Sequence, residues 1–104
     1  MEHSGKLIAI LGSTGSGKGV LIEYVRSLHP EFIAPVSLTT RTMRPGEVDG
    51  IHYHFVSEEV FKKHVVADEF IEWVQFAGNY YGSLKKEILP YLEEGKIVLD
   101  EFDL

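Results

Sequence analysis

The chain has 104 residues, of which 44% are hydrophobic, 25% charged and 12% aromatic, and it contains no cysteine. This length suits one globular domain, the apolar content excludes a disordered chain, and the lack of cysteine excludes a disulfide scaffold. No apolar run approaches the ~20 residues that cross a bilayer, and the first residues lack a secretory pattern, so we expect a cytoplasmic protein with no membrane partner. Sixteen acidic and ten basic residues give a net charge of −6, which disfavours nucleic acid as a partner.

The first part of the chain predicts a strand followed by a helix. Residues 6–11 form an apolar run that ends at a glycine-rich turn, as is typical of a buried strand. Apolar side chains then recur at helical spacing over residues 18–28, which predicts a helix with one buried face. The members of this face are Val20, Leu21, Tyr24, Val25 and Leu28. Pro30 cannot continue a helix, so we expect it to end near His29.

The middle of the chain predicts shorter elements. We expect a strand over residues 33–40, and the alternation of apolar and polar side chains predicts another over residues 51–56. Ser57 followed by two glutamates is typical of a helix N-cap, and the helix should reach about Val66.

The last part predicts a hairpin, a helix and a final strand. Residues 71–76 and 80–83 read as strands joined across Gly78-Asn79. Residues 84–94 read as a helix that Pro90 should kink or shorten, and a strand follows from residue 96. This order predicts an α/β fold, with a parallel sheet as its core and a mostly antiparallel insertion.

A glycine-rich loop joins the first strand to the first helix. Residues 12–18 read Gly-Ser-Thr-Gly-Ser-Gly-Lys, the phosphate-loop pattern in its proper strand–loop–helix context. The glycines let successive N–H groups converge on a phosphate, the helix adds its dipole, and Lys18 adds a charge. The alternative is a glycine-rich turn without a ligand. The residues that we predict to bind ATP phosphates are Gly12, Ser13, Thr14, Gly15, Ser16, Gly17, Lys18 and Gly19.

One position departs from the usual phosphate loop. The residue after Lys18 is commonly a Ser or Thr that ligates Mg²⁺, but here it is Gly19, followed by Val20. The sequence therefore provides no direct protein ligand, and Mg²⁺ would be held through nucleotide oxygens and waters.

Three further blocks resemble the guanylate kinase family. Residues 37–53 match S-x-T-T-R-x-x-R-x-G-E-x-x-G-x-x-Y, and residues 69–83 contain E-F-I-E-W and G-N-Y-Y-G-S. Residues 99–104 (LDEFDL) are similar to the family's L-x-I-D segment, with Glu101 and Asp103 at the acidic positions and Phe102 in place of an aliphatic residue. Together with the phosphate loop, these matches cover nearly the whole chain in the family's order.

The resemblance implies a fold, a reaction and a set of site residues. The fold would be a parallel core like that of P-loop nucleoside triphosphate hydrolases, formed by residues 1–35 and 84–104, with a GMP-binding subdomain inserted at residues 36–83. The reaction would transfer the ATP γ-phosphate to GMP, with Mg²⁺, and depend on Lys18, Arg41 and Arg44. The implied GMP-binding residues are Ser37, Arg41, Arg44, Tyr53, Glu72, Tyr81, Gly82, Ser83 and Asp103.

The chemistry of these residues suits the implied ligand. Arg41 and Arg44 lie three apart and can hold one phosphate from two sides, aided by tyrosine hydroxyls. Guanine presents two adjacent N–H donors that a single carboxylate accepts, and the resemblance assigns this role to Glu72. By spacing alone the arginines would read as solvated and Glu72 as an outward strand residue. Glu101 or Asp103 would contact Mg²⁺ through water.

The family also closes a lid that carries further arginines. This chain has three arginines, Arg26, Arg41 and Arg44, so none is left for that role. We therefore interpret the sequence as the N-terminal portion of a guanylate kinase and expect little or no turnover from it alone.

Three other interpretations remain open at this level. A non-catalytic module of the same family would bind a peptide or phosphopeptide in the GMP cleft, although such modules usually have a degraded phosphate loop. A different P-loop kinase would act on another nucleotide, which Glu72 disfavours. A zinc site built from His52, His54 and His64 would lack a fourth ligand. The sequence does not indicate an oligomeric state.

Overall fold

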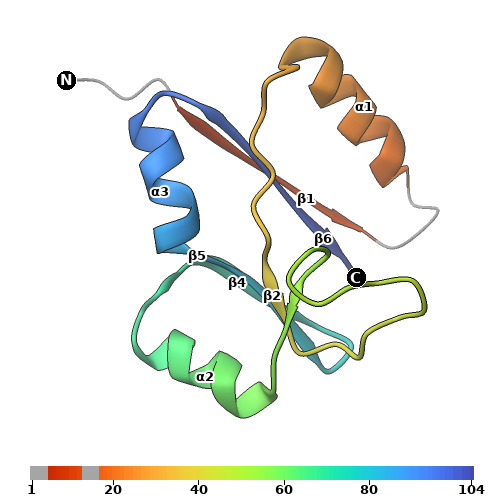
Figure 1. Cartoon of the computed structure of the whole chain (residues 1–104), viewed down its shortest axis with the longest axis vertical. Helices are drawn as coiled ribbons and strands as arrows, with labels where there is room; N and C mark the ends of the chain where they lie inside the picture. Colours follow the sequence, from red (N-terminus) through yellow and green to blue (C-terminus); the bar gives the residue numbers. More distant parts are fainter. Residues whose placement is uncertain (1–4, 13–16) are drawn as a thin grey trace. The chain divides into compact units, whose positions relative to one another are not determined.

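The computed structural model describes residues 5–12 and 17–104 (Figure 1). The chain is α/β and divides into two compact units. The first unit comprises Met1–Pro35 and Leu89–Leu104, and the second comprises Val36–Ile88. None of the helices in the described part of the chain is long and apolar enough to cross a membrane.

The first unit contains a parallel pair of strands. β1 (Lys6–Gly12) runs beside β6 (Ile97–Asp103), as Figure 1 shows. The two strands pair in continuous register, from Lys6 opposite Ile97 to Gly12 opposite Asp103. This confirms the two predicted strands. The prediction that β1 is buried holds only for Ile10, which is 7% exposed. In the described residues β1 pairs with β6 along one edge only, so most of its side chains keep some access to solvent.

β6 is the more buried of the two strands. Ile33 forms a parallel bridge with Val98, so β6 has a neighbour on each side. Val98, Leu99 and Phe102 are accordingly 0%, 4% and 1% exposed and form the core of this unit.

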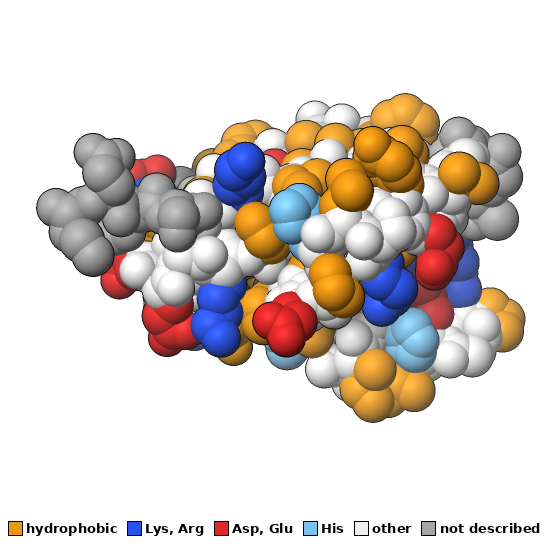
Figure 2. Space-filling model, turned by 90° about the horizontal axis from the view of Figure 1, so that it is seen from above, with side chains coloured by type: hydrophobic (Ala, Val, Ile, Leu, Met, Phe, Trp, Pro, Cys, Tyr) orange, Lys and Arg blue, Asp and Glu red, His pale blue; other side chains and the backbone are white. Residues whose placement is uncertain are grey.

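α1 (Lys18–Leu28) has the predicted length, and the N–H of His29 donates to the carbonyl of Val25 (2.8 Å). Of its predicted buried face only Val25 is half-buried, and Ile22 is half-buried beside it. The other apolar side chains are 53–74% exposed, namely Val20, Leu21, Tyr24 and Leu28. At 100° per residue these four occupy one arc of the helix, next to the arc that faces β1. Hydrophobic side chains also reach the surface on the face drawn in Figure 2.

The second unit contains a four-stranded sheet in the order β3-β2-β5-β4. Its strands are β2 (Leu38–Thr39), β3 (His54–Phe55), β4 (Phe70–Phe76) and β5 (Asn79–Leu84). β2 is parallel to β3, whereas the β2–β5 and β4–β5 pairs are antiparallel. The sheet is therefore mixed, and mostly antiparallel as predicted.

Two predicted strands in this region are too long. The expected strand over residues 33–40 breaks into Ile33, which bridges to β6, and the two residues of β2. Pro35 lies between them and has no N–H for a ladder, and the chain passes there from one unit to the other. In the expected strand over residues 51–56, only β3 pairs with β2, because Ile51 forms a turn in which its N–H donates to the carbonyl of Val48 (3.1 Å).

The β4–β5 hairpin turns one residue earlier than predicted. Ala77 and Gly78 are the two turn residues, with φ values of 52° and 84°, and Phe76 pairs with Asn79. Two successive positive φ angles are those of a type I′ turn, whose twist matches that of the flanking strands.

The core of the second unit lies between α2 and the sheet. α2 (Glu58–Val66) begins at Ser57, whose Oγ accepts the N–H of Val60 (3.1 Å), as predicted. Phe61 is fully buried and stacks on Phe70 with ring centroids 4.4 Å apart. Leu38 and Leu84 complete the cluster.

α3 (Lys85–Glu93) runs through Pro90 to its end. The sequence predicted that Pro90 would either kink or shorten this helix, and the structure shows that it does not shorten it. Ile88 is its fully buried residue.

Candidate functional site

The phosphate-loop candidates lie in the first unit. β1 ends at Gly12 and α1 begins at Lys18, so the strand–loop–helix arrangement is as predicted. The loop residues Ser13, Thr14, Gly15 and Ser16, and the side chain of Lys18, lie outside the described part. Gly17 is the N-cap of α1 with φ of 91°, a conformation that favours glycine. The first turn of α1 carries no acidic residue, so its dipole and N–H groups suit an anion.

Acidic residues lie beside the start of this loop. Asp103 is opposite Gly12 in the parallel register, and the N–H of Leu104 donates to the carbonyl of Gly12 (2.9 Å). Strand alternation places Glu101 on the same face of β6 as Asp103. The carboxyl ends of parallel strands are where α/β sheets bind their ligands. The structure thus brings both predicted acidic residues to the end of the sheet from which the loop departs.

Sequence reasoning passed over Asp100, which is 1% exposed in the middle of β6. Charged residues are rarely this buried unless they interact with other groups. The position of this aspartate inside an apolar run was the sequence signal that could have drawn attention to it.

Arg41 is held by Glu47 in the second unit. Its Nη1 donates to Glu47 Oε1 and its Nη2 to Glu47 Oε2, both at 2.9 Å, which makes a bidentate ion pair. Nη1 also donates to the carbonyl of Thr42 (3.2 Å). The backbone N–H of Arg41 donates to Thr39 Oγ1 (3.1 Å). The residue is 6% exposed, so the Arg41 guanidinium is packed into the loop and held by its hydrogen bonds, and is not a solvated side chain.

The ion pair changes the titration of both partners. The hydrogen bond from Arg41, reinforced by the N–H of Arg44, lowers the pKa of Glu47 from 4.5 to about 2 against the opposing effect of burial. The same hydrogen bond raises the pKa of Arg41 above its ordinary value. A lowered carboxyl pKa contributes stability above pH 4.5, and that contribution is lost as the pH falls toward 2.

Aromatic rings surround the Arg41 guanidinium. Its Cζ lies 5.2 Å from the ring centroid of Tyr53 and 5.7 Å from that of Phe55. The rings of Tyr53 and Tyr81 meet edge to face at 6.1 Å. The structure therefore brings together Arg41, Tyr53 and Tyr81, which the sequence assigned to one phosphate. Arg44 is exposed, and its backbone N–H donates to Glu47 Oε1 (2.7 Å).

A second polar group lies further along the same sheet. The hydroxyls of Ser37 and Ser83 are 2.8 Å apart, and both residues are buried. Glu72 on β4 lies directly opposite Ser83 on β5, and cross-strand partners point to the same face. Tyr81 and Ser83 are two residues apart on β5, so their side chains share a face at roughly 6–7 Å. One face thus carries an arginine–tyrosine group and a serine–glutamate group side by side.

Gly82, which the sequence grouped with the GMP residues, faces the other way. A Cβ at this position would lie 2.7 Å from the Phe70 ring and 3.0 Å from the Phe61 ring. The glycine lets β5 approach the core beneath these aromatic rings, so the structure gives it a packing role.

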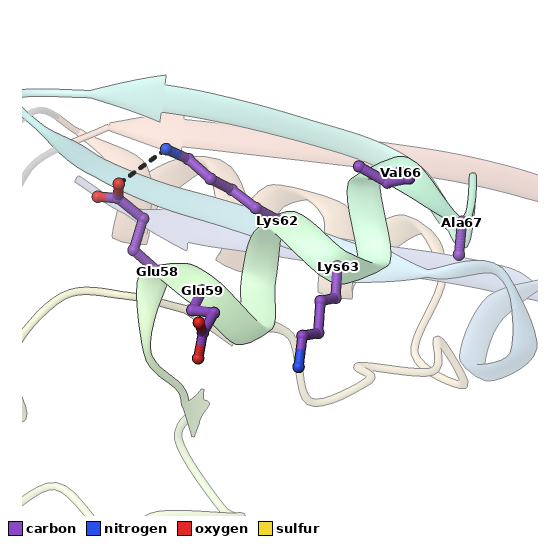
Figure 3. Close-up of a pocket in the computed structure, with 6 residues that line it drawn as sticks. All are labelled: Glu58, Glu59, Lys62, Lys63, Val66 and Ala67. Atoms are coloured by element: carbon purple, nitrogen blue, oxygen red, sulfur yellow. Dashed lines mark ion pairs between the residues drawn. The ribbon is translucent and has the colours of Figure 1, made fainter.

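A groove elsewhere in the second unit lacks the chemistry of a site. It has a volume of about 610 Å³, runs along α2 and is lined by Glu58, Glu59, Lys62, Lys63, Val66 and Ala67 (Figure 3). The Glu58–Lys62 ion pair (2.9 Å) joins two exposed side chains one turn apart, an arrangement typical of a solvated helix face. Of the predicted site residues that the structure describes, none lines this groove.

Glu47 is the site residue to which the sequence assigned no role. It lies inside the long motif, six residues after Arg41 and three after Arg44, and this spacing within a loop was the signal that could have revealed it.

Comparison with known proteins agrees with these motifs. The guanylate kinase family model matches residues 4–103. The guanylate kinase of Carboxydothermus hydrogenoformans is 40% identical over 102 residues, which are 98% of this chain and 50% of that protein. That of Nostoc sp. is 46% identical over 101 residues, 97% of this chain and 51% of the relative.

A solved structure matches as well. The crystal structure of guanylate kinase from Anaplasma phagocytophilum superposes with a TM-score of 0.70 and 31% identity, over 96% of this chain and 50% of that one. The chain thus spans about half the length of the curated relatives that it matches. With its phosphate-loop setting, its arginine–tyrosine group and a family match over nearly every residue, the chain belongs to the guanylate kinase family.

Proposed function

We propose that the second unit binds GMP and that the loop between β1 and α1 binds the phosphates of ATP, the two substrates of a phosphoryl transfer that gives ADP and GDP. The observation that carries this proposal is the pair of polar groups on one face of the second sheet. A nucleoside monophosphate has an anionic end and a base end, and the two groups match these ends in chemistry. Residues 36–83 would then be the GMP-binding subdomain of a P-loop core formed by residues 1–35 and 84–104.

The phosphate of GMP would lie at the arginine–tyrosine group. Arg41 and Arg44 supply positive charge, and Tyr53 and Tyr81 supply hydroxyl groups that can donate to phosphate oxygens. The chain is acidic overall, so this positive charge is local to the site.

The base would lie at the serine–glutamate group. The Glu72 carboxylate can accept the two adjacent N–H donors of guanine, whereas adenine has no such pair on that edge. The hydroxyls of Ser37 and Ser83 can serve as donors or acceptors for the remaining polar atoms. Selection of guanine over adenine would then depend on a buried polar match, which discriminates more strongly than apolar contact.

ATP would bind at the amino end of α1. Gly12, Gly17 and Gly19 allow the backbone to approach the phosphates, and Lys18 would carry the neutralising charge. The acceptor phosphate of GMP is already ionised, so transfer needs positioning and charge neutralisation and no general base. Lys18, Arg41 and Arg44 would supply that neutralisation. A chain without cysteine fits a reducing compartment, and we place this function in the cytoplasm.

Mg²⁺ fits only as an ion carried by the nucleotide. The described residues hold no group of three His, Cys, Asp or Glu side chains arranged for a metal, and position 19 lacks a hydroxyl. Glu101 and Asp103 would contact the waters of such an ion, as the family resemblance implies. The ion would supply charge neutralisation on the phosphates.

Replacement of the base-recognising carboxylate tests the proposal. We expect the chain to bind GMP in isothermal titration calorimetry and to bind AMP at least ~10-fold more weakly. Glu72→Gln should weaken GMP binding by ~10- to 100-fold, because an amide cannot accept both N–H donors, and should leave AMP binding unchanged.

Glu59→Gln provides the matched control, since Glu59 is exposed on α2 and should not affect either ligand. Equal affinity of the unaltered chain for GMP and AMP would refute guanine selection, and preference for a phosphopeptide would favour the non-catalytic module. Binding is the chosen measurement because we expect turnover by this chain alone to be slow.

A further inference from the structure

Glu47 occupies one edge of the Arg41 guanidinium. A guanidinium offers an end-on edge, formed by Nη1 and Nη2, and a side-on edge, formed by Nη2 and Nε. Both carboxylate oxygens of Glu47 accept from the end-on edge at 2.9 Å, and the carbonyl of Thr42 takes a further donation from Nη1 at 3.2 Å. The donors on the end-on side of Arg41 are therefore committed within the protein.

The side-on edge of Arg41 is left for another acceptor. Its Nε is buried and has no hydrogen-bond partner among the residues that the structure describes. The residue as a whole is 6% exposed, so this donor has little contact with solvent in the structure. A buried N–H donor of a charged group destabilises the protein when it has no acceptor. A hydrogen bond from such a donor to an anionic oxygen is correspondingly strong.

Glu47 also anchors the second arginine. Its Oε1 accepts the backbone N–H of Arg44 at 2.7 Å, so one carboxylate ties the guanidinium of Arg41 to the backbone of Arg44. The rings of Tyr53 and Phe55 lie against the same guanidinium and limit its rotation. Each of these contacts restricts the conformations that the Arg41 side chain can adopt.

We propose that Glu47 is a positioning residue of the phosphate site: it holds Arg41 by the end-on edge so that the side-on edge, Nε–H with Nη2–H, faces the phosphate of GMP. This inference rests on the proposed function. Glu47 touches neither the ligand nor the reacting atoms, and it acts through the orientation of Arg41 and of the Arg44 backbone. The loop between β2 and β3 is thereby organised before the nucleotide arrives.

Electrostatics alone predicts the opposite effect of Glu47. A carboxylate close to an anion site repels the anion, so its neutralisation should tighten the binding of GMP. If orientation dominates, neutralisation should weaken the binding of GMP. The sign of the change therefore distinguishes positioning from simple repulsion.

The test compares GMP with guanosine, which has the same base and no phosphate. Glu47→Gln keeps the size of the side chain and an oxygen for the Arg44 N–H, but loses the bidentate grip on Arg41. We expect the affinity for GMP to fall about tenfold or more, as for a misaligned charge-assisted hydrogen bond, and the affinity for guanosine to stay within about twofold. NMR chemical-shift titration measures both ligands on the same sample.

Two further variants complete the test. Glu58→Gln breaks another Glu–cation pair of the second unit, also 2.9 Å long, and should alter neither affinity. Glu47→Asp keeps the charge and should recover part of the lost affinity for GMP.

Each outcome of this test has one meaning. Tighter or unchanged GMP binding by Glu47→Gln would overturn the positioning role, and so would an equal loss of guanosine, which would indicate general loosening of the fold. If the unaltered chain binds neither ligand, the proposed function fails, and the role of Glu47 fails with it.

Discussion

At the scale of single residues, the junction between the phosphate loop and α1 shows what the chain lacks for metal binding. Gly19 is the second residue of α1, and among the residues that the structure describes, its chain neighbours aside, a Cβ at this position would have nothing within 4 Å. A hydroxyl side chain therefore meets no obstacle from the described part of the chain. Position 19 is also where phosphate loops commonly carry the hydroxyl that ligates Mg²⁺.

We predict that Gly19→Ser strengthens the binding of ATP only when Mg²⁺ is present. Calorimetric titration with Mg²⁺ and with EDTA should show a gain of several-fold in the first case and none in the second, because the added hydroxyl can ligate the ion. Both Gly19→Ser and the control Gly19→Ala should stabilise the helix by ~0.5–1 kcal/mol. If Gly19→Ala gains as much affinity with Mg²⁺ as Gly19→Ser does, the hydroxyl has no role.

The residues of the candidate site differ in how far sequence can predict them. Arg41, Tyr53 and Tyr81 were grouped by motif, and the structure places their side chains in contact. Glu47 was missed, because a motif names residues without saying which of them contact the ligand and which hold another side chain. Gly82 belongs to the same motif, yet its position is explained by the Phe61 and Phe70 rings beneath it. Pair contacts of this kind depend on tertiary structure.

At the scale of elements, local signals predicted the helices and the long strands well. α1, α2 and β6 have strong local patterns, and their observed limits lie within a residue or two of those predicted. The predicted ranges of the short strands β2 and β3 were too long. A two-residue strand is defined by the strands that it pairs with, and not by the alternation of polar and apolar residues in its own sequence. The exposed arc of α1 was mispredicted for a related reason: periodicity shows which residues share a face, but not what covers that face.

The β4–β5 turn stores local strain at Ala77. Its φ of 52° lies in the left-handed region, where a residue with a Cβ is disfavoured by about 1–2 kcal/mol, whereas asparagine is favoured at the first position of a type I′ turn. We predict that Ala77→Asn raises the free energy of unfolding by ~0.5–1 kcal/mol, measured by urea denaturation.

Ala67→Asn is the matched control for this substitution. Ala67 follows α2 with φ of −81°, so the same change relieves no strain there and should give no comparable gain. An Ala77→Asn variant that is no more stable than the unaltered chain would show that the turn is not strained.

At the scale of the whole molecule, charge and exposed apolar surface act against each other. The net charge is −6 at pH 7, and the pI is about 5.3. Repulsion between copies therefore weakens as the pH falls from 7 toward 5.3. The exposed arc of α1, formed by Val20, Leu21, Tyr24 and Leu28, offers apolar surface of the kind through which copies associate.

We predict reversible self-association that rises as the pH approaches 5.3. Static light scattering should show it, and the double substitution Leu21→Gln with Tyr24→Gln should suppress it without changing the net charge. Val66→Gln is the control, since Val66 is 87% exposed on α2 and lies in the other unit. Equal suppression by this control would mean that the arc of α1 is not the contact surface.

The exposed arc also determines how the protein responds to concentration. Folding is independent of concentration, whereas pairing through α1 grows with the square of the monomer concentration. Dilution or a pH well above 5.3 should therefore disperse the copies and leave both units folded.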